Sequence, residues 1–107
     1  MTEEFKKRAL KKSKTTAGIP DSVTVYDERI SDLIEAAVIK MRTGGVPKSV
    51  IDEGSALVFS CIAHYVCFEL RGDTGETRDA KWHHDKFDDM EFLLSLEKEG
   101  ATMEGLL

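Results

Sequence analysis

Residues 55–71, SALVFSCIAHYVCFELR, decide the fold of this 107-residue chain. At the roughly 100° per residue of an α-helix, the apolar side chains of this stretch surround almost the whole circumference. Ser60, His64 and Arg71 form a narrow polar stripe, with Glu69 alone elsewhere. A helix that is apolar on all sides must be covered on all sides. The pattern therefore predicts either the central helix of a small bundle or a helix that a second subunit covers in part.

The flanking sequence predicts three more helices, and the fold class is therefore expected to be all-α. Helical spacing of apolar residues predicts one helix over residues 26–42 and another over residues 78–98, and a short helix is expected over residues 46–51. No segment alternates apolar and polar residues with a period of two, so no sheet is expected. We expect a bundle of about four helices, one of them short, around the long apolar helix, with mobile termini.

Local signals indicate where these helices begin. Thr24 followed by Asp27 resembles a capping box at the start of the helix over residues 26–42. Pro47 suits the first turn of the short helix, and Ser55 suits the N-cap of the long apolar helix. Trp82, at the start of the last helix, is expected to be a core anchor.

Charge divides the chain into unequal parts. Residues 1–14 hold six bases and two acids, for a charge of +4, whereas the remaining residues carry −9. We interpret residues 1–20 as a basic N-terminal arm, because a helix over residues 2–12 would have too few apolar residues to be stable alone. Residues 21–100 are then one helical domain, and residues 101–107 form a C-terminal tail.

The basic arm is a candidate contact for nucleic acid, although a solvated, partly frayed terminus is the simpler interpretation. The acidic remainder of the chain argues against a broad phosphate-binding surface, because cationic contacts dominate nucleic-acid binding. The candidate contact residues of the arm are Lys6, Lys7, Arg8, Lys11, Lys12 and Lys14.

No membrane segment is expected. The stretch over residues 55–71 is shorter than the roughly 20 residues that a span needs, and it carries charged side chains. The first residues lack the apolar run of a signal peptide, so we expect the protein to be made in the cytoplasm. Cys61 and Cys67 lie six residues apart on different faces of one helix, which predicts two free, buried thiols.

The sequence offers little catalytic chemistry. Cys61 and His64, three residues apart, could converge, but His83 and His84 point about 100° apart and cannot easily join one site. No metal-binding motif is present, so neither a metal nor a cofactor is expected. Apolar surroundings should raise the pKa of Cys61 and make it a poor nucleophile. The chain is therefore predicted not to be an enzyme, with His83 and His84 as surface residues.

The order of the helices resembles that of the small helical head–tail connector proteins of tailed phages, also called head-completion or adaptor proteins. The resemblance covers about residues 24–98 and rests on three segments in sequence order. They are VYDERISDLIEAAVIKM, then GVPKSVIDEG before the long apolar helix, and DAKWHHDKFDDMEFLLSL after it. The basic arm, KKRALKKSK, is not part of the pattern.

The resemblance implies a structural subunit that forms a ring, usually of about twelve copies, beneath the portal protein of the capsid. DNA would pass through the ring without sequence-specific contact, and the next connector or tail protein would bind the ring. The location would be the head–tail interface of the virion, and the host cytoplasm during assembly. Candidate interface residues are Ile39, on the outer side of its helix, and Met103, Leu106 and Leu107 in the tail.

A second interpretation stays open, in which the chain is a small helical DNA-binding or regulatory module that uses the basic arm. A DNA-binding module should retard DNA with a steep salt dependence, whereas a connector should bind portal protein and show little DNA affinity.

Overall fold

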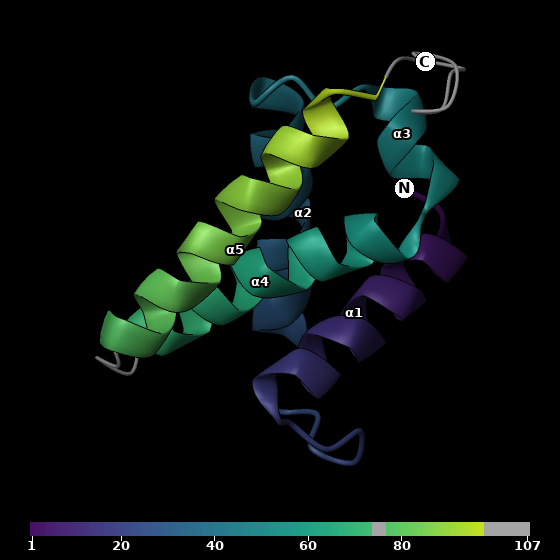
Figure 1. Cartoon of the computed structure of the whole chain (residues 1–107). Coiled ribbons are helices and arrows are strands. Elements are labelled where there is room, and N and C mark those ends of the chain that lie inside the picture. Colours follow the sequence, from purple (N-terminus) through teal and green to yellow (C-terminus); the bar gives the residue numbers. More distant parts are fainter. Residues whose placement is uncertain (74–76, 98–107) are drawn as a thin grey trace.

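The computed structural model describes residues 1–73 and 77–97, which form five α-helices and no strand (Figure 1). The helices are α1 (Glu3–Ala17), α2 (Asp27–Thr43), α3 (Lys48–Glu53), α4 (Ala56–Asp73) and α5 (Thr77–Ser95). The prediction of an all-α fold is confirmed, with one helix more than expected.

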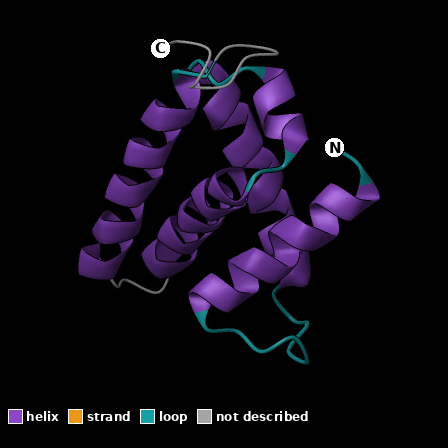
Figure 2. Cartoon of the chain, turned by 45° about the vertical axis from the view of Figure 1, so that its right-hand side comes forward, coloured by secondary structure: helices purple, strands orange, loops and turns teal. Residues whose placement is uncertain are grey.

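The long apolar helix α4 is the centre of the fold. It contacts α1, α2 and α5, and the two views of Figures 1 and 2 show it crossing between α1 and α5. Its buried residues cover about two thirds of the circumference: Val58, Phe59, Cys61, Ile62, Ala63, Tyr65, Val66 and Cys67. Leu57, Ser60, His64 and Phe68 lie in the remaining sector and are half-buried. The chain itself thus covers most of this helix.

Residues 1–20 do not form the expected arm. Residues 3–17 are the helix α1, which buries Phe5 and Ala9 against the core. The Thr2 hydroxyl accepts a hydrogen bond from the Phe5 amide at 3.1 Å, and Gly18 ends the helix in a left-handed conformation with φ of 76°. The sequence prediction failed because it weighed the stability of this helix alone, whereas most helical stability in proteins comes from tertiary packing.

Lys14 joins α1 to the start of α2. Its ammonium group pairs with the Asp27 carboxylate at 2.9 Å and donates hydrogen bonds to the backbone carbonyls of Asp21 and Val23. The capping box expected from Thr24 and Asp27 is wrong, because the Asp27 carboxylate pairs with Lys14 and the N-cap residue of α2 makes no side-chain cap. Lys14 is only 3% exposed, so it is not available as a contact residue of a basic arm.

The remaining helix starts follow the sequence more closely. Pro47 is the N-cap of α3, and the Ser55 hydroxyl accepts a hydrogen bond from the Val58 amide at 3.2 Å, as expected of an N-cap. Among the described residues, no helix combines the length and apolar character that crossing a membrane requires.

Candidate functional site

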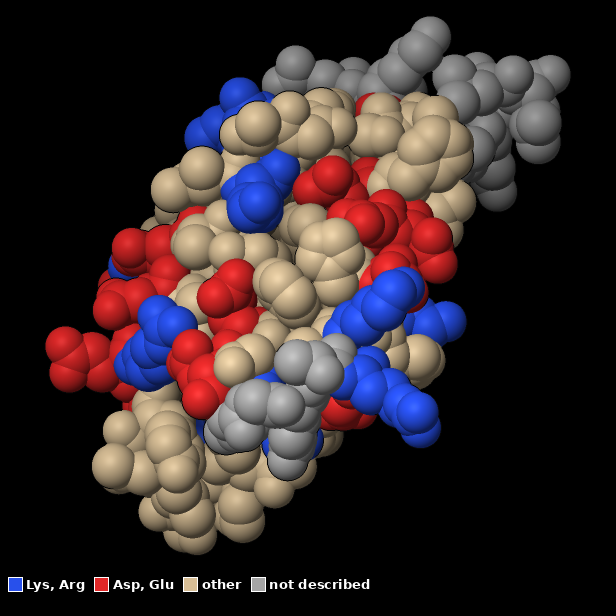
Figure 3. All heavy atoms as spheres, turned by 90° about the vertical axis from the view of Figure 1, so that its left-hand side faces the viewer, with Lys and Arg blue, Asp and Glu red and all other residues tan. Residues whose placement is uncertain are grey.

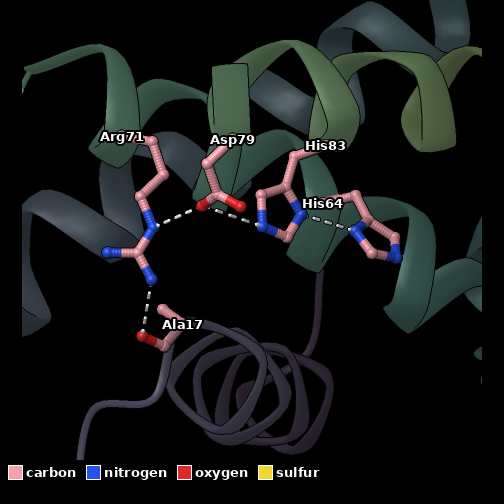
Figure 4. Close-up of polar contacts among 5 residues, drawn as sticks. All are labelled: Ala17, His64, Arg71, Asp79 and His83. Carbon is pink, nitrogen blue, oxygen red and sulfur yellow. Dashed lines mark hydrogen bonds and ion pairs between the residues drawn. The ribbon is translucent and has the colours of Figure 1, made fainter. Parts of the chain in front are cut away.

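A polar network links α1, α4 and α5 (Figure 4). The Arg71 guanidinium donates a hydrogen bond to the carbonyl of Ala17 at 3.3 Å and pairs with the Asp79 carboxylate at 2.9 Å. The same Asp79 oxygen lies 3.8 Å from His83 Nε2. On the other side of its ring, His83 Nδ1 lies 2.9 Å from His64 Nδ1. One of these two Nδ1 atoms donates its hydrogen and the other accepts it.

The environment of the two histidines favours their neutral forms. Burial lowers the pKa of His64, and the neighbouring His83, Lys86 and Lys12 lower it further. Burial also lowers the pKa of His83, with Arg71 acting in the same direction and Asp79 opposing it. Two fully protonated rings would place hydrogens on both Nδ1 atoms and break their contact. The contact between the two rings therefore favours the state in which both histidines are neutral.

His83 was expected at the surface, and the structure corrects this prediction, because its side chain is buried against α4. Its place one residue after Trp82 explains both errors on this helix. Consecutive residues point about 100° apart, so the burial of His83 turns Trp82 outward, where it is half-exposed instead of being a core anchor. A polar residue at a core position gave no apolar signal in the sequence.

The cysteines are not arranged for catalysis. The sulfur of Cys61 lies 3.8 Å from the carbonyl oxygen of Phe87, whereas the His64 ring contacts His83. Burial, together with Glu91 and Asp88, raises the pKa of Cys61 to about 12, and burial raises that of Cys67 to about 11. Both are free, buried thiols. In the part of the chain that the structure describes, no group of three or more His, Cys, Asp or Glu residues is placed to hold a metal ion.

Helix α5 carries an exposed apolar face. Trp82 is 52% exposed, and three further large side chains share its side of the helix: Phe92 (63%), Leu93 (51%) and Leu96 (42%). Trp82 lies near the start of α5 and Phe92 ten residues further on, about 15 Å along the axis, with the exposed Asp85 and Asp89 between them on the same side. Leu96 directly follows the last residue of the helix. The opposite side of α5 is packed through Ala80, His83, Phe87 and Leu94. The packed side of α5 is therefore mainly apolar, whereas its exposed side carries large apolar residues interspersed with charged ones.

Ile39, a candidate interface residue, is 66% exposed on the outer side of α2. Met103, Leu106 and Leu107, the candidates in the tail, lie outside the described residues. Ile39 stands at the rim of a cleft of about 480 Å³ between α2, α4 and α5.

This cleft has aromatic walls and an acidic character. Tyr65, Phe68 and Phe87 contribute rings, and the charged residues of the lining are Lys40, Glu69, Asp88 and Glu91, with His84 paired to Asp88 at 3.3 Å. Burial raises the pKa of Glu91, and Asp88 raises it further. The Glu91 carboxylate occupies space next to Gly44 that a Cβ atom there would fill, so glycine allows this acid to lie against the end of α2.

The basic residues of α1 form a surface on another part of the molecule. Lys6, Lys7, Arg8, Lys11 and Lys12 are all exposed. Arg8, Lys11, Lys12 and Thr15, together with Ala56 and Phe59 of α4, line an open hollow of about 340 Å³. The Arg8 guanidinium lies 4.5 Å from the centre of the Phe59 ring. Helix formation thus places on one side of α1 three cations that the sequence analysis had assigned to an arm.

Charged side chains are unevenly distributed over the surface. The face in Figure 3 shows acidic and basic side chains in patches, with uncharged surface between them. The net charge of −5 is therefore not a uniform negative coat.

Comparison of the chain with models of protein families, with curated proteins and with solved structures finds no match. The resemblance to phage connectors stays a prediction from the sequence.

Proposed function

We propose that the protein is a structural head–tail connector subunit of a tailed phage or prophage. It forms a ring beneath the portal, and DNA passes through this ring to the tail. The observation that carries the proposal is the exposed apolar face of α5, formed by Trp82, Phe92, Leu93 and Leu96.

Exposed apolar surface that is bordered by polar residues is typical of sites that bind another protein. Trp82 would supply a large contact area, and tryptophan is enriched among the residues that dominate interfaces. We assign this face to protein contacts within the connector, with the portal protein or with the next connector or tail protein.

A structural role fits the chemistry of the interior better than a catalytic one. The thiols of Cys61 and Cys67 have raised pKa values and are buried, which makes them poor nucleophiles. The His64–His83 pair lies between α4 and α5, where the two rings contact each other and His83 lies near the Asp79 carboxylate. We interpret this network as a device that holds three helices together.

The acidic surplus suits a passage for DNA. Glu28, Asp32 and Glu35 are exposed along one side of α2 at helical spacing. If this side faces the channel, like charges repel the DNA backbone and keep it from adhering. Reversal of these three acids should then slow DNA exit or stall packaging, and unchanged packaging would place them away from the DNA.

The decisive experiment is a measurement of mass by light scattering over a range of concentrations, with and without purified portal protein, and electron microscopy of the heaviest species. We expect a closed ring of about a dozen subunits, alone or on the portal. The variant Trp82→Ser should reduce binding, whereas Tyr26→Ser, which removes another exposed aromatic residue, should not. A chain that stays monomeric and does not bind the portal would overturn the proposal.

The rival function is a DNA-binding or regulatory module, and the cationic surface of α1 is the observation that favours it. Removal of residues 1–14 is not a clean test, because it would also remove Phe5 and Ala9 from the core. Lys11→Gln with Lys12→Gln is cleaner, since both side chains are exposed. Loss of a steeply salt-dependent DNA retardation in this variant would support the rival.

A further inference from the structure

We propose that copies of this chain associate head to tail, with the basic stripe of α1 (Arg8, Lys11 and Lys12) seated on the acidic cleft of the next copy. The proposal rests on the proposed function, because it names the lateral contact within the ring. It commits to a second copy of the chain as the occupant of the cleft.

The two surfaces lie on opposite sides of the central helix. Ala56 and Phe59 of α4 border the basic hollow, whereas Tyr65, Phe68 and Glu69 border the acidic cleft. At roughly 100° per residue, these two groups point about 160° apart around the axis of α4. A contact between different surfaces on opposite sides of one subunit is heterologous, and it produces a ring when the rotation closes.

The basic surface lacks a counter-charge. Within the described residues, Arg8, Lys11 and Lys12 form no ion pair, and Arg8 and Lys12 are like charges one helical turn apart. Like charges at this spacing on a helix repel each other. An acidic partner surface would remove this repulsion.

The cleft carries the opposite charge. Glu69, Asp88 and Glu91 outnumber its one lysine, Lys40. The raised pKa of Glu91 has burial and Asp88 as its main causes, so a cation brought close to these carboxylates would favour their ionised forms. The charge of each surface thus complements that of the other.

The apolar parts of the two surfaces also match. Ile39 projects from the rim of the cleft, and the basic hollow has Ala56 and Phe59 in its lining. An isoleucine side chain that enters this hollow would bury its apolar surface between the aliphatic stems of the basic residues. This match favours a second copy over nucleic acid, because a phosphate backbone offers no apolar counterpart to Ile39.

The test uses two variants that each destroy one surface. The basic-surface variant carries Arg8→Glu, Lys11→Glu and Lys12→Glu, and the cleft variant carries Glu69→Lys and Glu91→Lys. Each variant alone should fail to assemble on its own or on the portal, with the dissociation constant of self-association raised at least tenfold. An equimolar mixture presents one intact pair of surfaces and one pair in which both charges are reversed, so the mixture should recover assembly that neither variant shows alone.

Controls separate charge effects from misfolding. Lys48→Glu reverses an exposed cation that lines neither surface and should assemble as the unchanged chain does, and circular dichroism should show the same helix content throughout. Assembly of both multiple variants at unchanged strength would overturn the head-to-tail contact while leaving the connector function intact. An unchanged chain that stays monomeric with and without portal would overturn the proposed function itself. DNA retardation lost only in the basic-surface variant, with self-association unchanged, would identify nucleic acid as the partner and overturn this proposal.

Discussion

Helices α1 and α5 flank the same central helix but use their apolar residues in different ways. Helix α1 has few apolar residues, but Phe5 and Ala9 are buried, and so is Lys14. Helix α5 is rich in large apolar residues and leaves Trp82 and Phe92 exposed. Position around the helix therefore decides burial, and apolar content alone does not.

The two helices also differ in which of their sides stabilise the fold and which are available for assembly. The packed side of α1 is narrow and serves the fold, while its outer side is basic and free for a partner. The outer side of α5 carries large exposed apolar residues among charged ones, and a contact through those apolar residues would be driven by burial of surface instead of charge. Association through α1 should weaken with salt, whereas association through α5 should not.

The strongest test of this comparison is to replace two neighbouring leucines of α5 one at a time. Leu94 is fully buried, so Leu94→Ala should lower the free energy of unfolding by about 2–5 kcal/mol. Leu93 is half-exposed on the apolar face, so Leu93→Ala should cost less than about 0.5 kcal/mol but weaken binding to the portal. Urea unfolding measures both. Equal losses of stability would mean that α5 does not have one packed and one free side.

Two lysines on α1 provide the corresponding test. Lys14→Met leaves Asp27 without its partner and removes two hydrogen bonds, and it should lower the free energy of unfolding by about 2–3 kcal/mol. Lys11→Met changes an exposed residue and should stay within about 0.5 kcal/mol of the unchanged chain. If both variants were equally stable in urea, α1 would not be fastened to α2 through Lys14.

The His64–His83 contact predicts that stability falls in acid. Their pKa values are lowered in the folded chain, so below about pH 6.5 the unfolded chain binds more protons than the folded one. This contribution to stability is fully present above that pH and is lost as the pH falls towards the lowered pKa values. Thermal unfolding between pH 7.5 and 5 should show the decrease.

A double variant, His64→Gln with His83→Gln, should flatten this pH dependence even if it is less stable at pH 7.5. His84→Gln, at an exposed neighbouring position, should retain the slope of the unchanged chain. A slope that is unaffected by the double variant would assign the acid sensitivity to other groups.

The smallest expected effect is at Glu91, where one substitution should change stability and association in opposite directions. Burial raises the pKa of Glu91 in the folded chain. As the pH rises above the ordinary pKa of glutamate, the ionised Glu91 carboxylate therefore lowers the stability of the folded chain. Glu91→Gln should therefore raise the free energy of unfolding at pH 7 by about 0.5 kcal/mol, a value reduced for partial exposure. The same change should weaken self-association, because it removes one carboxylate from the cleft. A variant that is more stable and also associates more strongly would contradict the head-to-tail contact.

Much of the fold could be predicted from local patterns. The apolar stretch over residues 55–71 predicted a central helix, the apolar spacing predicted α2 and α5, and Ser55 was correctly expected to cap α4. The candidate surfaces were less predictable. Ile39 was recognised because it stands alone on a polar side of its helix, whereas the cleft beside it needs residues from three helices.

The sequence by itself determined the helical class and the position of the all-round apolar helix, because both follow from periodicity within one segment. Only the tertiary structure decided that α1 is part of the core, that His83 is buried and that Trp82 is exposed. Each of these depends on which side of a helix meets α4, and that choice is made by the combined packing of several helices. The opposite placement of the basic and acidic surfaces has the same origin, since it joins residues that are far apart in the chain.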